Sequence, residues 1–197
     1  IISEIRSLRD QLQKVQELEA SPIKPFSPLF DEINRKYERF SDNTAENFLN
    51  MAKWCCENGL VQPGLTLLQE NCVTVLSYAL DIDWNNIGKR KDIKSAIYIL
   101  LKGIPKEKWR VRNRNLVENV IEQIKPFRDL IEPFGKIGRY RNDINHAGTR
   151  KNVHSAQQLY QELKENIEKL EPFFRKMDEM IKSKKEERGL EDETSRH

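Results

Sequence analysis

The segment 141–146, which reads Arg-Asn-Asp-Ile-Asn-His, contains the residue types that can cleave RNA without a metal ion. An arginine offers a phosphate a fixed fork of N–H donors and stays charged at any physiological pH. A histidine can accept or donate a proton near neutral pH. Arg141 and His146 are therefore the first candidates for a catalytic site.

Cleavage of RNA by its own 2′-hydroxyl requires three contributions. The hydroxyl must lose a proton, the charge on the phosphorane must be stabilised, and the leaving 5′-oxygen must gain a proton. We assign charge stabilisation to Arg141 and proton transfer to His146. Asn142 and Asn145 would orient the substrate or hold the histidine ring. Asp143 is a weaker candidate for a base, because the nearby arginines should keep its carboxylate ionised.

The spacing of Arg141 and His146 restricts how the two side chains can meet. Five residues turn a helix through about 500°, which leaves these side chains about 140° apart around the axis. They converge on one phosphate only if the helix ends near His146, or if two copies of the chain face each other across a twofold axis. The second arrangement also supplies two histidines to each site, so we favour a homodimer.

A purely structural interpretation competes with the catalytic one. Arg141 could form an ion pair with Asp143, and His146 could bond a nearby carbonyl. However, Arg139, Tyr140 and the paired asparagines make the segment rich in donors and poor in carboxylates, which favours catalysis. We therefore take Arg139 and Asn145 as supporting RNA-binding residues.

A second basic group follows Pro105 and includes an aromatic residue. Such a combination can hold an RNA backbone or stack a base, although a solvated loop accounts for it equally well. Its members are Lys106, Lys108, Trp109, Arg110, Arg112 and Arg114. Further along the chain, we expect His154 to cap the helix that follows it.

The charge of the chain is unevenly distributed. Residues 84–155 hold seventeen Lys and Arg against seven Asp and Glu, while the remaining residues hold seventeen against twenty-four. This asymmetry suggests a polyanion site in the middle of the chain, with solvated helix faces as an equally weighted alternative.

Composition argues against several classes of protein. No stretch of about 18 apolar residues occurs, so the sequence predicts no membrane span. The three cysteines, Cys55, Cys56 and Cys72, match neither a disulfide framework nor zinc-ligand spacing. We expect buried, reduced thiols in a cytoplasmic protein that uses no metal or other cofactor.

Apolar residues follow helical spacing from end to end, which predicts an all-α bundle. Pro172 predicts a kink or a break in the last long helix, and the charged tail from Ser183 should fray. The first expected helices cover 30–40, 44–58 and 60–80, and a further helix around 93–101 is closed by Pro105. Another helix covers 115–124, and the next follows Gly135 and Gly138 and ends at Ala147-Gly148. The last is a long helix with apolar residues from Leu159 to Ile181.

The chain divides into three parts. A two-heptad apolar seam in residues 1–15 predicts a connecting helix, and residues 21–26 indicate a linker. We therefore expect a connecting helix and linker over 1–25, a helical domain over 26–185 and a charged tail over 186–197. Because the first residue is Ile, we expect a processed form or a fragment whose natural start is missing.

The run 141–148, Arg-Asn-Asp-Ile-Asn-His-Ala-Gly, resembles the signature of HEPN-domain ribonucleases. Trp54 and the runs 58–60 and 64–70 are similar to a helix pair of CRISPR-associated CARF–HEPN proteins. The resemblance spans residues 44–148, and the two blocks together are far more specific than either alone. It implies an all-helical HEPN domain that homodimerises to form a composite ribonuclease site.

The resemblance also implies the roles of individual residues. It matches Arg141 and His146 to the catalytic positions and Asn142 to the polar position after the arginine. Members of this family cleave single-stranded RNA without metal in type III CRISPR antiviral defence. A cyclic oligoadenylate activates them by binding an N-terminal CARF domain. We find no α/β CARF domain in this chain, so we expect an effector part and do not carry the activation over.

Our hypothesis is a metal-independent endoribonuclease that cleaves single-stranded RNA as a homodimer in an intracellular defence system. The first alternative is a non-catalytic HEPN-type module that binds RNA or dimerises. The second is a helical bundle whose basic middle binds an acidic protein.

Overall fold

The computed structural model describes residues 24–40, 44–145 and 154–194, together with Ser7, Asp10, Gln11, Gln13 and Lys14. Every regular element within these residues is a helix, which confirms the predicted all-α fold. No helix in the described residues is long and apolar enough to cross a membrane.

The α-helices and short 3-10 turns follow one another along the chain with brief connections. They are η1 (Lys24–Phe26), α2 (Ser27–Tyr37), α3 (Thr44–Glu57), α4 (Val61–Ala79), α5 (Ile87–Lys102), η2 (Lys106–Lys108), α6 (Arg114–Ile124), η3 (Lys125–Phe127), α7 (Arg128–Ile131), α8 (Phe134–Asn145) and α9 (Ala156–Thr194).

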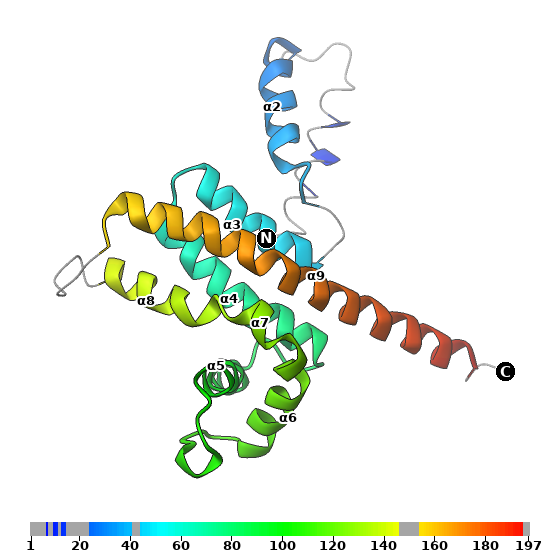
Figure 1. Cartoon of the computed structure of the whole chain (residues 1–197). Helices are drawn as coiled ribbons and strands as arrows, with labels where there is room; N and C mark the ends of the chain where they lie inside the picture. The colour runs from blue at the N-terminus through cyan, green and yellow to red at the C-terminus, as the bar shows by residue number, and fades with distance from the viewer. Residues whose placement is uncertain are drawn as a thin grey trace.

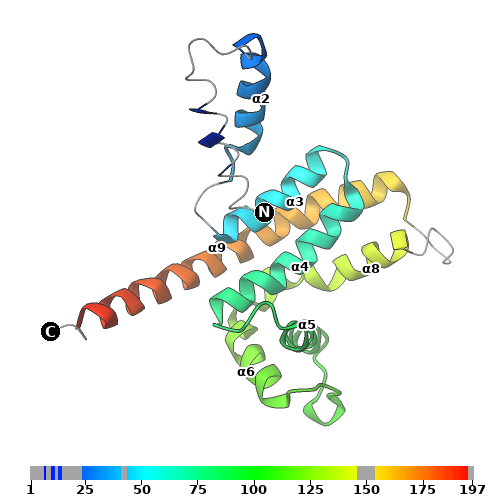
Figure 2. The ribbon, with the colours of Figure 1, turned by 180° about the vertical axis from the view of Figure 1, so that it is seen from behind.

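Helix α4 lies at the centre of the bundle. It packs against α3, α5, α8 and α9, and α5 in turn packs against α6 (Figures 1 and 2). Leu68 and Leu76 of α4, Ile137 of α8 and Leu163 of α9 are fully buried in one core. Burial of each such side chain contributes about 1.5–3 kcal/mol. The central helix therefore fixes the position of α8, which carries the segment 141–145.

Helix α4 and helix α9 approach each other closely at Gly64. A Cβ added at Gly64 would lie 2.6 Å from Leu163 Cδ2 and 3.2 Å from Cys55 Cβ. A larger residue would therefore push α9 away from the start of α4.

The thiols of Cys55, Cys56 and Cys72 are buried as predicted, and none of the three cysteines forms a disulfide.

Local signals account for the ends of the helices. Gly59 and Gly103 adopt positive φ angles of 69° and 60°, which glycine tolerates best, and they follow α3 and α5. The first agrees with the predicted stop, whereas the second ends α5 before Pro105, which was expected to close it. Asn86 caps α5 by accepting a hydrogen bond from the Lys89 N–H at 3.0 Å.

Helix α8 differs from the prediction at its start. Gly135 and Gly138 lie inside α8 and do not precede it. The residues Ala147-Gly148, where the helix was predicted to end, lie outside the described residues, as does most of the predicted connecting helix over 1–25.

Helix α9 corrects three further predictions. It continues through Pro172 without a break, and it extends to Thr194 where fraying was expected from Ser183. Its N-terminal cap is Ser155, whose Oγ accepts from the Gln158 N–H at 3.2 Å, and Gln158 Oε1 accepts from the Ser155 N–H at 2.7 Å. This reciprocal pair is a capping box, so His154 is not the cap.

Candidate anion site on helices α4, α5 and α8

Arg141 lies on the face of α8 that packs against α4. Its Nη1 is 3.5 Å from Oε1 of Glu70, and 28% of its side chain is exposed. The sequence suggested that the segment was poor in acids, but the fold brings this carboxylate from α4. The competing interpretation paired Arg141 with Asp143, and the structure instead gives it Glu70 as a partner.

Glu70 also binds two cations of α5. Its Oε2 accepts from Arg90 Nη2 at 2.9 Å, and its Oε1 accepts from Lys94 Nζ at 2.6 Å. Arg90 is held further by Thr74, whose Oγ1 accepts from Nη1 at 2.9 Å. Three cations therefore share one carboxylate, and we call Glu70, Arg90, Lys94 and Arg141 the Glu70 cluster.

The Glu70 cluster has a definite protonation state and charge. Burial alone would raise the pKa of Glu70, but the hydrogen bonds from Lys94 and Arg90 outweigh it and lower that pKa below its usual value of 4.5. The carboxylate is therefore ionised at neutral pH. Because it neutralises only one of three positive charges, the cluster remains cationic and favours an anion.

The neighbours of Arg141 on α8 point in different directions. Asn145, one turn further on, accepts a hydrogen bond from Gln62 Nε2 of α4 at 2.9 Å through its Oδ1. Asn142 is exposed. Arg139 is also exposed and lines a separate cavity of about 400 Å³ between α5, α8 and α9. The structure thus brings Asn145 beside Arg141 but places Arg139 on another face of α8.

Asp143 and His154 form a contact that the sequence did not indicate. His154 Nδ1 donates to Asp143 Oδ2 at 2.8 Å, with 6% of the aspartate side chain and 29% of the histidine side chain exposed. The histidine ring meets the Tyr140 ring edge-on at a centroid distance of 5.1 Å.

Burial and a hydrogen bond to the Glu162 carboxylate raise the pKa of Tyr140 to about 12, so its hydroxyl stays protonated.

The dyad Asp143–His154 has the arrangement that orients a catalytic imidazole. A carboxylate that accepts from Nδ1–H fixes the neutral ring in the tautomer whose Nε2 can accept a proton. From the sequence alone, His154 is expected to cap the following helix, because it lies outside the segment 141–146. The observation that identifies His154 as a candidate is its contact with Asp143, a buried acid on α8, and this contact exists only in the folded chain.

His146 lies outside the described residues, directly after the last described residue of α8, Asn145. Its placement relative to Arg141 therefore stays a prediction. Asn142 is exposed, and its role in orienting the substrate likewise stays a prediction.

The arginines of the second basic group do different things. Arg110 lines a cavity beside Trp109. Arg112 lies against Gly88, where an added Cβ would come within 3.0 Å of its Nη1. Arg114 donates to the Lys106 carbonyl at 2.6 Å, and its guanidinium carbon lies 5.8 Å from the centre of the Trp109 ring. Arg114 therefore braces this loop, whereas Arg110 lines the cavity and has no ion-pair partner among the described residues.

The described residues contain no group of three or more His, Cys, Asp or Glu side chains that could hold a metal ion. No protein-family model, curated protein or solved structure matches the chain.

Proposed function

We propose that the chain is a metal-independent endoribonuclease domain that cleaves single-stranded RNA as a homodimer, in type III CRISPR defence. The observation that carries this proposal is the ion pair of Arg141 with Glu70 inside a cationic cluster. The ion pair holds the guanidinium in place against α4 and leaves the surrounding charge positive. Both properties suit a residue that must meet a phosphate.

Arg141 would stabilise the charge that develops on the phosphorane. A preorganised donor of this kind is typically worth about 10²–10³ in rate. Glu70 would act as a positioning residue, because its carboxylate fixes the guanidinium and is itself fixed by Arg90 and Lys94. A guanidinium without such a partner would sample many rotamers and spend less time aimed at the phosphate.

His146 would transfer one of the two protons, and the homodimer would supply the second His146. The dyad Asp143–His154 adds another imidazole to each protomer. The number of histidines per chain alone therefore no longer requires a dimer. In the proposal, His146 remains the principal acid or base and His154 is the additional candidate.

The experiment that tests the proposal is cleavage of an unstructured, end-labelled RNA by the purified chain in EDTA. We expect 2′,3′-cyclic phosphate and 5′-hydroxyl ends, and no cleavage at a position where the RNA carries a 2′-deoxyribose. His146→Ala and Arg141→Ala should each reduce the rate by at least about 10²-fold. Arg175→Ala is the matched control, since Arg175 lies on α9 outside the Glu70 cluster and pairs with the Glu171 carboxylate at 2.7 Å.

The proposal fails if His146→Ala and Arg141→Ala cleave as fast as Arg175→Ala, or if the products carry 5′-phosphates. The role of His154 is read separately from the pH dependence of single-turnover rates. If the His154→Ala variant loses the rise or the fall of its rate with pH, His154 transfers a proton. If the rate is lower at every pH but depends on pH in the same way, His154 has a structural role. Sedimentation of the wild-type chain tests the homodimer.

The alternative function is RNA binding without cleavage. It is favoured by the cationic Glu70 cluster, which suits a phosphate whether or not a histidine stands nearby. Salt-sensitive RNA binding by the wild-type chain, with intact RNA recovered from it, would support this alternative over the ribonuclease.

A further inference from the structure

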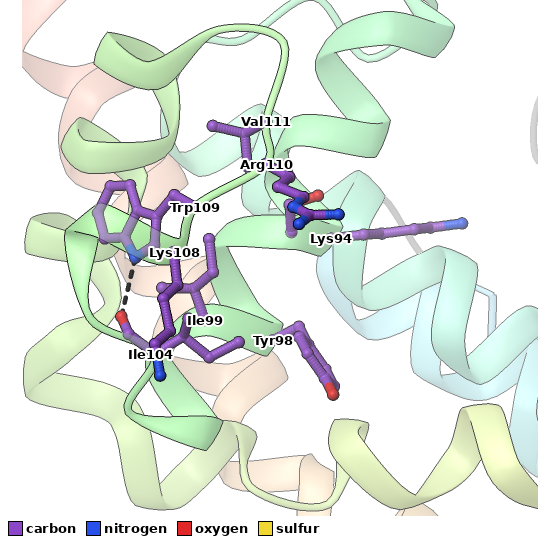
Figure 3. A pocket seen from close by; sticks show the side chains of 9 residues that line it. Lys94, Tyr98, Ile99, Ile104, Lys108, Trp109, Arg110 and Val111 are labelled. Atoms are coloured by element: carbon purple, nitrogen blue, oxygen red, sulfur yellow. Dashed lines mark hydrogen bonds between the residues drawn. The ribbon is translucent and has the colours of Figure 1, made fainter.

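The cavity beside Trp109 lies against α5, on the side of the molecule that also presents Lys94. It encloses about 370 Å³, a size in the range of small-molecule sites. Figure 3 shows it between the side chains of α5 and the loop that carries Trp109. Apolar groups such as Ile104 and Val111 form part of its wall.

Trp109 is a wall of this cavity and is itself held in place. Its Nε1 donates to the Ile104 carbonyl at 2.8 Å, and the Arg114 guanidinium lies over its ring. The sequence predicts Trp109 as a ring that could stack a base. In the structure the exposed ring at this cavity belongs instead to Tyr98 of α5, which is 53% exposed.

The charged side chains that line the cavity are Lys94, Lys108 and Arg110, and they are all cations. Lys94 is also a member of the Glu70 cluster, so the cavity and the Arg141 site are contiguous across α5. Tyr98 lines this cavity and also the separate cavity that contains Arg139. A chain of phosphates could thus follow a row of cations on both sides of one exposed ring.

We propose that the Trp109 cavity receives one unpaired nucleobase of the RNA, stacked on Tyr98, with the flanking phosphates on Lys94 and Arg110. The flat apolar wall and the exposed ring suit a base, and the cationic rim suits its phosphates. A peptide made only of acidic residues would satisfy the cations but has no apolar group for the wall of the cavity. The inference rests on the proposed function only in taking the bound strand to be the substrate.

The test measures binding apart from cleavage. Full-length His146→Ala chain is titrated into a fluorescent, unstructured RNA in EDTA, and binding is followed by anisotropy. Tyr98→Ala should weaken binding by about tenfold, whereas Tyr98→Phe should keep it, because stacking needs only the ring. The matched control is Tyr160→Ala, an exposed tyrosine of α9 that lines a different cavity.

The phosphate contacts are tested with Arg110→Ala against Arg175→Ala. Arg110→Ala should reduce the slope of log affinity against log salt by about 0.7, the value for one phosphate contact on a single strand. An abasic oligonucleotide of equal charge should bind the Tyr98→Ala variant as tightly as it binds the chain that retains Tyr98. Arg110→Ala should still weaken the binding of this oligonucleotide.

Three results would overturn the inference. One is equal RNA affinity of Tyr98→Ala and Tyr160→Ala. Another is the same tenfold loss with the abasic oligonucleotide. The third is a poly-glutamate peptide that binds as tightly as RNA and competes with it. Binding that follows the expected pattern in a wild-type chain that does not cleave would support the cavity and reject the ribonuclease, so the two proposals fail separately.

Discussion

His154 Nδ1 and Asp143 Oδ2, 2.8 Å apart, join the residue before the cap of α9 to the buried face of α8. The residues between these two helices, 146–155, include His146. The contact therefore joins α8 directly to the residue that precedes the cap of α9. It does so with a nearly buried carboxylate, for which the histidine ring replaces water as a donor.

Substitution of His154 by Ala should lower the free energy of unfolding by about 1–3 kcal/mol, because it removes a hydrogen-bonding partner of a nearly buried carboxylate. Urea denaturation at neutral pH measures the change. Gln157→Ala, at an exposed position in the first turn of α9, is the control. Equal unfolding free energies for the two variants would show that the contact does not stabilise the fold.

Substitution of Glu70 by Gln should slow RNA cleavage while leaving RNA binding intact or stronger. The amide no longer holds the Arg141 guanidinium by charge, and it removes the one negative charge of the Glu70 cluster. We expect a rate loss on the order of 10²-fold in single-turnover assays. Glu171→Gln is the matched control, because Glu171 also pairs with two cations, Lys53 and Arg175. A parallel loss of binding and rate would contradict a positioning role for Glu70.

The lowered pKa of Glu70 also predicts how stability depends on pH. Because the folded-state pKa lies below the usual value of 4.5, ionised Glu70 stabilises the fold above that pH. This contribution is lost as the pH falls through the folded-state value. Glu70→Gln should therefore lose less stability than wild type between about pH 7 and about pH 3, as measured by urea denaturation. The exposed Glu122→Gln should behave as wild type.

Substitution of Gly64 by Ala should destabilise the fold, whereas Gly138→Ala should not. At Gly64 the added Cβ meets Leu163 and the Cβ of Cys55, and such overpacking costs about 1–3 kcal/mol. At Gly138 the nearest atom is Gln69 Nε2 at 3.1 Å, the end of a flexible side chain. Alanine is favoured over glycine inside a helix by roughly 0.5–1 kcal/mol. Thermal unfolding of both variants tests this, and a stable Gly64→Ala would refute the close approach.

The helices were predictable from the sequence because their apolar spacing and their capping residues are local signals. The structure confirms helices close to the expected segments 44–58, 60–80 and 115–124. Of the kink or break predicted at Pro172, the break was wrong, because buried side chains on both sides of it, including Leu170 and Phe173, hold α9 against the bundle. That packing offsets the cost of a proline inside a helix.

The partners of the site residues were not predictable from local sequence. Arg141 was weighed against Asp143, two positions along, but residues at that spacing do not face each other on a helix. Its observed partner is Glu70 on α4, which only the packing of α4 against α8 brings close. Asp143 reaches His154 across residues 146–153 for the same reason. Tertiary packing therefore decides which acidic side chains contact the residues of a basic segment.

Lys94 is shared between the carboxylate of Glu70 and the rim of the Trp109 cavity. An anion that draws this amine toward the rim takes a hydrogen bond from Glu70 and leaves that carboxylate more available to Arg141. Thermodynamic reciprocity then requires that an anion bound at Arg141 alters affinity at the rim by the same factor by which an anion at the rim alters affinity at Arg141. A single mobile amine can in this way couple occupancy of one face of α5 to the alignment of a side chain on α8.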